Sequence, residues 1–356
     1  MLVCHVTPTY FSPESVLGGG ERFAGELARA MAERVDVKLV SFGRREICER
    51  PSPHFERVVL RSRTRDLMTP FSWKLFRELR EADVIHCHQY FTLPTFFAVL
   101  AGRLRRRPVF VTDLGGGGWT PGYQIDQSRW IAAHLPISEY AARSLPGRHR
   151  RHRVIWGGVD PARYPVRAEW THDGSAVFLG RLLPHKGVHF LIAGLPPGVP
   201  LDVIGPEPDP SYAARLRELA RGMDVRFHGA LPDAAVIARL GEAMALVHPT
   251  PVDAAGSAGV SELFGLALVE AMARGCPVVA SDAASLPEIV QTEQSGLLVP
   301  PNDPAAIRQA LERLRGDAGL WRRLSAGARQ RVEERFTWEH VVDRCLAAYR
   351  EHGACG

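Results

Sequence analysis

Two glutamates eight positions apart, Glu262 and Glu270, are the residues of this chain best placed to do chemistry together. Glu262 precedes a helix expected to begin near Leu266, and Glu270 lies about one turn inside that helix. Gly265 allows a close turn, so that the amides of Leu266 and Ala267 face an anion with help from the helix dipole. The segment predicts a site for a phosphorylated ligand that also carries hydroxyl groups.

A second segment, residues 178–187, supplies cations where a strand closes and a helix opens. Arg181 offers a planar fork for phosphate oxygens and Lys186 a compact point charge. Cations at a helix start oppose the helix dipole unless an anion is present. The chain has only three lysines, at positions 38, 74 and 186, and keeps one of them here. We therefore expect Arg181 and Lys186 to neutralise phosphate.

These two segments together resemble the retaining glycosyltransferases of family 4, which have the GT-B fold. The E-x7-E spacing, followed by Gly275-Cys-Pro-Val-Val, is a fairly specific signal, whereas a glycine run alone is weak. The resemblance covers most of the chain. Four further segments fit it: Gly18–Glu21, Asp83–His88, Val154–Asp160 and Leu297–Asp303.

The resemblance implies transfer of a sugar from a nucleotide-diphosphate donor to a hydroxyl-bearing acceptor, with the anomeric configuration retained. Glu262 would contact hydroxyls of the donor sugar, and Glu270 would accept hydrogen bonds from the ribose. Arg181 and Lys186 would hold the diphosphate as the leaving group gains charge, in place of a metal ion. Gly19 would bring its backbone close to the donor phosphate or the acceptor. No cofactor, metal or protein nucleophile is expected.

The main departure from the family pattern lies after the strand that ends near Thr112. Many relatives have a histidine that faces the donor sugar at the position of Leu114, and leucine can neither donate a hydrogen bond nor carry charge. Asp113 is either a replacement for that histidine or a cap of the glycine-rich turn. The departure also motivates a rival reading as an inactive sugar-nucleotide-binding scaffold. Another rival is a phosphorylase or hydrolase on the same fold.

Short apolar segments alternate with longer amphipathic ones in both halves of the chain, which predicts βαβ units and two mainly parallel sheets. Ligands of such doubly wound α/β sheets bind beyond the carboxyl ends of strands. The glycine run, Asp113, Arg181 to Lys186 and the two glutamates all follow predicted strands, so we expect them to line one cleft. The strands are expected near 2–8, 35–41, 57–61, 83–87, 108–112, 134–138, 153–156, 175–180, 200–204, 224–227, 244–248, 277–280 and 297–299.

A length of 356 residues favours two domains. We expect an N-terminal Rossmann-like acceptor domain at 1–160 and a C-terminal Rossmann-like donor domain at 161–336. By the resemblance, a last helix at about 337–356 crosses back to the first domain.

Charge is unevenly distributed between the halves. Residues 1–155 contain 24 Lys and Arg against 15 Asp and Glu, a net charge of +9, while the remainder carries −4. The surplus could attract an acidic acceptor or an anionic membrane, or could reflect an Arg-rich composition; no nucleic-acid partner is expected. The stretch Phe71–Arg80, together with Arg61, Arg63 and Arg65, is either a basic amphipathic membrane-surface element or a core-facing helix with a charged outer side.

No signal peptide or membrane span is predicted, because the longest apolar run, Leu93–Ala101, is far shorter than the roughly 20 residues that a span needs. The six cysteines form no Cys-x-x-Cys pair, as in reduced intracellular proteins. A cytoplasmic location follows, with peripheral contact to the inner face of the membrane left open. His86 and His88 share one face of a strand, but without a third ligand of fitting spacing no metal site is expected.

Overall fold

The computed structural model describes residues 1–10, 19–62, 64, 69–115, 125–144, 151–166, 174–256 and 262–353. The chain divides into two compact units. Unit 1 comprises Met1–Gly158 and Trp338–Gly356, and unit 2 comprises Val159–Thr337. Each unit has its own sheet and its own apolar core.

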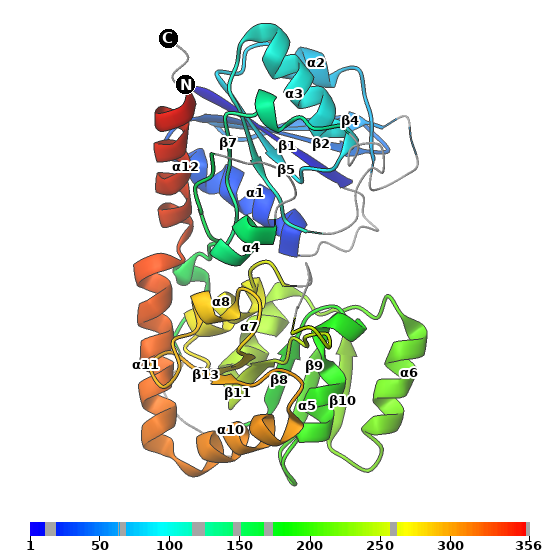
Figure 1. Cartoon of the computed structure of the whole chain (residues 1–356), viewed down its shortest axis with the longest axis vertical. Coiled ribbons are helices and arrows are strands. Elements are labelled where there is room, and N and C mark those ends of the chain that lie inside the picture. Colours follow the sequence, from blue (N-terminus) through cyan, green and yellow to red (C-terminus); the bar gives the residue numbers. More distant parts are fainter. Residues whose placement is uncertain are drawn as a thin grey trace. The chain divides into compact units, whose positions relative to one another are not determined.

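Unit 1 is built on a seven-stranded sheet in the order β3-β4-β2-β1-β5-β6-β7 (Figure 1). Neighbouring strands run parallel, except that β3 is antiparallel to β4. The order reverses between β1 and β5, which is the position where doubly wound sheets bind ligands. The strands are β1 (Leu2–Tyr10), β2 (Asp36–Gly43), β3 (Ile47–Ser52), β4 (Phe55–Arg61), β5 (Val84–His88), β6 (Val109–Thr112) and β7 (Ala133–His134).

The last helix of the chain belongs to unit 1, where it lies beside the first helix (Figure 1). The rings of Trp338 and Phe23 meet at 5.4 Å between centroids. The expected return of the C-terminal helix is thus confirmed. The helices of unit 1 are α1 (Gly19–Met31), α2 (Leu75–Glu78), α3 (Leu93–Arg105), α4 (Glu139–Ser144) and α12 (Trp338–Gly353).

Unit 2 is built on a six-stranded parallel sheet in the order β10-β9-β8-β11-β12-β13. The order reverses between the neighbours β8 and β11. Doubly wound sheets bind their ligands at such a reversal, beyond the carboxyl ends of the two strands. The strands are β8 (Ala176–Leu179), β9 (Leu201–Ile204), β10 (Val225–Gly229), β11 (Ala245–His248), β12 (Val278–Ser281) and β13 (Leu297–Val299).

Aspartates begin several helices of unit 2. Asp209, Asp303 and Asp317 each accept hydrogen bonds from backbone amides two or three residues ahead. Proline follows Asp209 and Asp303 at the first helical position, where its missing N–H costs nothing. The helices are α5 (Val188–Gly194), α6 (Pro210–Leu219), α7 (Asp233–Glu242), α8 (Leu266–Ala273), α9 (Leu286–Ile289), α10 (Pro304–Gly316) and α11 (Ala318–Arg335).

Burial on both faces explains why the central strands are largely apolar and do not alternate. Every residue of β11 and of β12 is buried. Phe178 of β8, Leu191 of α5 and Leu311 of α10 are fully buried members of one core in unit 2. These layers confirm the expected pair of doubly wound, Rossmann-like α/β folds.

One strand prediction was wrong and one strand was not predicted, both in unit 1. Residues 153–156 form no strand, although Val154 and Ile155 are buried, because the chain pairs there only through an isolated bridge from His152 to His134. The strand that is not predicted is β3, an exposed edge strand with almost no apolar pattern.

The stretch at residues 71–80 contains only one helical turn, α2. Leu75 and Leu79 anchor it in the core of unit 1, whereas Trp73 is 59% exposed. The Trp73 ring contacts Phe71, Phe76 and Phe97, with centroids 4.9 to 6.1 Å apart. The stretch therefore combines a core-facing side with an exposed aromatic edge. Arg63 and Arg65, which the sequence analysis grouped with it, lie outside the described residues.

Within the described ranges, every helix is too short or too polar to cross a membrane.

Candidate functional site

The switch point between β8 and β11 brings three ionisable side chains of unit 2 into contact. Glu262 Oε2 accepts hydrogen bonds from Lys186 Nζ and from His248 Nε2, each at 2.6 Å. Lys186 follows β8, His248 ends β11, and Glu262 precedes α8. Lys186 and Glu262 are predicted from the sequence, whereas His248 is not.

A glycine allows this close arrangement of loops. Gly187 has a φ of +69°, in the left-handed region that favours glycine, and follows the 3-10 turn Pro184–Lys186. A Cβ at position 187 would collide with the carbonyl oxygen of Pro249, the residue after His248. Glycine therefore lets the lysine loop lie against the end of β11.

Ser285 fixes the backbone that carries Glu262. Its buried hydroxyl lies 3.0 Å from the carbonyl oxygen of Glu262 and 2.7 Å from that of Phe264. Gly265 then takes a φ of +116° and starts α8. The position of the glutamate thus depends on the serine between β12 and α9, which the sequence analysis did not single out.

The surroundings keep Glu262 ionised. Its side chain is 9% exposed, and this burial alone would raise the pKa of the carboxyl. The nearby Lys186 and His248 outweigh burial and hold the pKa of Glu262 well below its usual range. While both partners lie on Oε2, the other oxygen, Oε1, accepts no hydrogen bond from any residue the structure describes.

The remaining predicted residues of unit 2 lie on the same loop and helix. Arg181 is exposed. Burial lowers the pKa of His185, and the nearby charges of Lys186 and Arg181 lower it further, so both cations lie close to His185. Glu270 is half-buried, one turn inside α8. The amides of Leu266 and Ala267 begin α8 and donate to no backbone oxygen of the described chain. In the described part of the chain, the Glu262 carboxylate has Lys186 and His248 as its hydrogen-bond partners, so neither Arg181 nor Glu270 bonds to it.

In unit 1, the predicted glycine turn and the end of β6 lie close together. A Cβ on Gly20 would lie 3.5 Å from Cβ of Leu114, so the leucine packs against the start of α1, next to Gly19. Asp113 Oδ1 accepts the amide of Gly115 at 3.3 Å. Burial raises the pKa of Asp113 despite this hydrogen bond. The contact supports the capping alternative, and a catalytic role of Asp113 stays a prediction. Gly18 lies outside the described residues.

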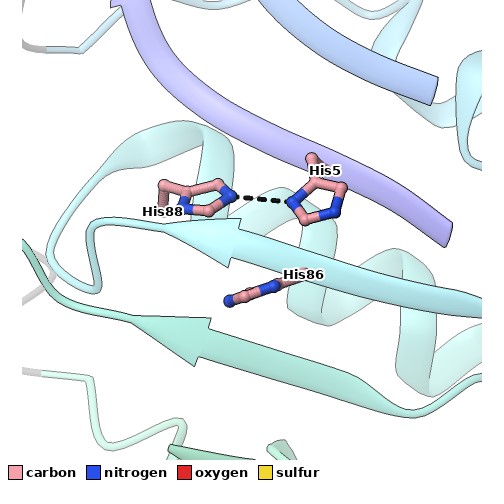
Figure 2. A group of neighbouring side chains, drawn as sticks. All are labelled: His5, His86 and His88. Atoms are coloured by element: carbon pink, nitrogen blue, oxygen red, sulfur yellow. Dashed lines mark hydrogen bonds between the residues drawn. The ribbon is translucent and has the colours of Figure 1, made fainter. Parts of the chain in front are cut away.

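A cluster of three buried histidines occupies the centre of unit 1 (Figure 2). The sequence predicts no third ligand of fitting spacing beside His86 and His88, but β1 supplies His5. His5 Nδ1 lies 2.9 Å from His88 Nε2. Burial lowers the pKa of His5 to about 3 and holds the pKa values of the other two well below the usual range. The three rings are therefore neutral at physiological pH.

The geometry of this cluster favours hydrogen bonding within the core. His86 Nε2 lies 2.8 Å from Thr112 Oγ1, and His86 Nδ1 lies 2.7 Å from the hydroxyl of Tyr349 on α12. The rings of His86 and His88 stack at 4.6 Å, so their in-plane lone pairs do not converge on one point. An ion would have to displace Thr112 or Tyr349 before His86 could bind it. The contact with Tyr349 ties α12 to the sheet of unit 1.

Comparison with known proteins matches both units to one enzyme class. The family described as Glycosyltransferase Family 4 matches residues 17–163, and the family described as Glycosyl transferases group 1 matches residues 174–317. Glycogen synthase of Mycobacterium tuberculosis is 33% identical over 207 residues, which are 55% of this chain and 47% of that protein. The chain thus spans about half the length of this relative. Alpha-maltose-1-phosphate synthase of Mycolicibacterium smegmatis is 26% identical, with 99% and 100% of the two chains covered.

Solved structures agree on the fold. HepE of Anabaena, crystallised with UDP and glucose, superposes with a TM-score of 0.76 at 18% identity and covers 99% of this chain and 100% of its own. Both family matches and the two doubly wound units lead to one assignment: the chain belongs to the family 4 glycosyltransferases, which have the GT-B fold.

Proposed function

We propose that this protein is a retaining glycosyltransferase that transfers a sugar from a nucleotide-diphosphate donor to a hydroxyl-bearing acceptor. The observation that carries the proposal is the ionised, buried Glu262, held by Lys186 beside the start of α8 at the switch point of unit 2. Such a position suits a ligand that has both phosphate and hydroxyl groups. The relatives named above are a glycogen synthase and an alpha-maltose-1-phosphate synthase, and HepE was crystallised with UDP and glucose.

Each residue has a task in the proposed reaction. Lys186 and Arg181 take up charge on the diphosphate as the bond between sugar C1 and the phosphate oxygen breaks. The amides at the start of α8 face the same phosphates. Glu262 accepts a hydrogen bond from a sugar hydroxyl, and Glu270 from the ribose. The acceptor oxygen bonds to C1 on the face that the phosphate leaves, and its proton passes to a donor phosphate oxygen.

The Lys186–Glu262 pair has a consequence for donor binding. A lysine held at 2.6 Å by a carboxylate must share its charge with the incoming diphosphate. The diphosphate carries more negative charge than the carboxylate, and Arg181 lies on the same loop to assist it. We propose that Lys186 moves toward the phosphates when the donor binds, and that the Glu262 carboxylate then accepts a hydrogen bond from a hydroxyl of the sugar.

Two measurements on the purified chain test the proposal. Release of nucleoside diphosphate is followed with UDP-, GDP- and ADP-sugars and a panel of hydroxyl acceptors, and the anomeric configuration of the product is read by proton NMR. The proposal predicts acceptor-dependent release and the donor's own configuration. Equal release with water or inorganic phosphate alone would favour the hydrolase or phosphorylase alternative. Binding without release under every condition would favour the inactive scaffold that Leu114 suggested.

Activity is expected to persist in excess EDTA, because Arg181, Lys186 and the α8 amides neutralise the diphosphate without a metal ion. The measurement compares turnover before and after chelation. Loss of turnover that added magnesium or manganese restores would contradict this expectation. The histidine cluster would then be a candidate metal site.

A basic surface in unit 1 supports a second part of the proposal, that the acceptor is anionic or lies at an anionic membrane. Arg44, Arg45, Arg61 and Lys74 line an open cavity of about 630 Å³ together with Glu46. The four basic side chains outnumber Glu46, which pairs with Lys74 at 2.7 Å, so the surface carries a net positive charge. The exposed Trp73 lies next to Lys74 in the chain.

We therefore expect the protein to co-sediment with vesicles that contain anionic lipid and to be released as salt rises, since screening acts over about 8 Å at physiological ionic strength. Arg45→Ser combined with Arg61→Ser should reduce pelleting several-fold. Arg221→Ser, which removes an exposed charge from unit 2, should not. Equal pelleting on neutral and anionic vesicles, or none on either, would point to a soluble acceptor.

A further inference from the structure

We infer that His248 is a positioning residue: it fixes one oxygen of Glu262 so that the other is presented to a hydroxyl of the donor sugar. The inference rests on the proposed function and goes beyond it, because it assigns a task to a residue that no sequence motif marked.

The Glu262 carboxylate is held through one of its two oxygens. Both partners of Glu262 lie on Oε2, at 2.6 Å each, and Oε1 receives no hydrogen bond from the described residues. A carboxylate held by one oxygen in this way has a fixed plane and one acceptor oxygen left for a ligand. The sugar hydroxyl is the donor that the proposed function places there.

The two partners differ in rigidity. His248 is the last residue of β11, a strand paired on both sides, and the residue is 3% exposed. Lys186 ends the short 3-10 turn Pro184–Lys186, outside the sheet, and has a long side chain with four rotatable bonds. Once a diphosphate attracts the lysine, His248 is the one described side chain still bonded to the Glu262 carboxylate. Without His248, the buried carboxylate of Glu262 would no longer be held in one orientation when the donor sugar is bound.

The other nitrogen of the ring supplies an independent observation. His248 Nδ1 is buried and has no hydrogen-bond partner in the described part of the chain. A buried polar atom without a partner lowers stability, so an apolar side chain would serve packing better at this position. The hydrogen bond from Nε2 to Glu262 accounts for a histidine here.

Unit 2 contains a matched control. His228 Nε2 lies 2.6 Å from Asp202 Oδ1, at β10 and β9, and Asp202 is buried. This pair repeats the chemistry of the contact between His248 and Glu262 but lies on two strands away from the switch point. If breaking any buried histidine–carboxylate contact lowered kcat/KM, His228→Leu should lower kcat/KM as well.

The test compares His248→Leu, His248→Gln and His228→Leu with the wild type, using UDP with UDP-glucose and GDP with GDP-mannose as probes. His248→Leu should lower kcat/KM for the nucleotide sugar about 10- to 100-fold, as for loss of a hydrogen bond to a charged group. Its affinity for the bare nucleotide should change less than about threefold. Glutamine keeps an N–H that can reach Oε2, so His248→Gln should recover most of the loss. His228→Leu should leave kcat/KM unchanged.

Several results would overturn the inference. These are wild-type kcat/KM in His248→Leu, an equal loss of affinity for bare nucleotide and nucleotide sugar, and no recovery in His248→Gln. If His248→Leu does not fold, the comparison of His248→Gln with the wild type decides alone: a loss beyond about tenfold would contradict the inference. Failure of the proposed function is a different result, because the wild type would then turn over none of the nucleotide sugars.

Discussion

Lys186→Ala is expected to weaken binding of the nucleoside diphosphate about 10- to 100-fold, because it removes a charge-assisted contact worth ~1.5 to 3 kcal/mol. Turnover should fall further, since charge on the diphosphate grows as the sugar bond breaks. Isothermal titration calorimetry with the nucleotide that the wild type prefers measures the first effect. Arg181→Ala should weaken binding to a similar degree, and because Arg181 is exposed its melting temperature should stay close to that of the wild type.

The stability of Lys186→Ala provides a second readout. The substitution leaves the buried Glu262 with His248 as its remaining described partner, so it should also lower the free energy of unfolding. The depressed pKa of Glu262 stabilises the fold above the usual value of 4.5, and this contribution is lost as the pH falls below that value. The difference in melting temperature between variant and wild type should therefore narrow in acid.

Lys38→Ala is the control. Lys38 is a similarly covered lysine of unit 1, paired with Glu78 at 3.2 Å and Glu56 at 3.4 Å. Its replacement should lower stability without changing nucleotide affinity. Wild-type affinity in both Lys186→Ala and Arg181→Ala would rule out the phosphate clamp.

The two glutamates should give opposite results when each is replaced by alanine. Glu270→Ala should weaken binding of the bare nucleotide about 10-fold or more, because the ribose loses its acceptor. Glu262→Ala should leave that binding intact or strengthen it, since Lys186 no longer shares its charge with a carboxylate. Its turnover of the nucleotide sugar should fall at least 100-fold.

Calorimetry with the bare nucleotide and turnover with the nucleotide sugar separate these effects. Glu262→Gln, which keeps the shape but not the charge, should fall between Glu262→Ala and the wild type in turnover. If Glu262→Ala reduces affinity for the bare nucleotide as much as Glu270→Ala does, the assigned roles are wrong.

The fold and part of the site could be predicted from the sequence because their signals are local. Strands buried on both faces give continuous apolar runs, and the loops after β8 and β11 carry the charges expected at a switch point. The contact between Lys186 and Glu262 follows from this topology, since both segments lie at the carboxyl ends of neighbouring strands. The edge strand β3 gave no such signal, because pairing with β4 alone holds its exposed residues.

His248 and Ser285 could not be predicted, for a physical reason. Each acts through a contact with Glu262 or its backbone, 14 and 23 residues away in the sequence, and neither has a spacing that a motif would record. Gly187 lets the lysine loop lie against Pro249, the residue after His248, and this close approach is likewise absent from any motif. His5 is similar: it meets His88 because β1 and β5 pair in parallel, a register that the sequence alone did not reveal.

The central claim is that the switch point of unit 2 binds the diphosphate and the sugar of one donor. Calorimetric titration of the wild type and Lys186→Ala with UDP, GDP and ADP, and then with the sugar form of the best ligand, tests it most directly. The account predicts that one nucleotide binds the wild type in the presence of EDTA, that its sugar form also binds, and that Lys186→Ala weakens both about 10- to 100-fold. Absence of binding by every nucleotide and its sugar form, or binding that Lys186→Ala leaves unchanged, would contradict it.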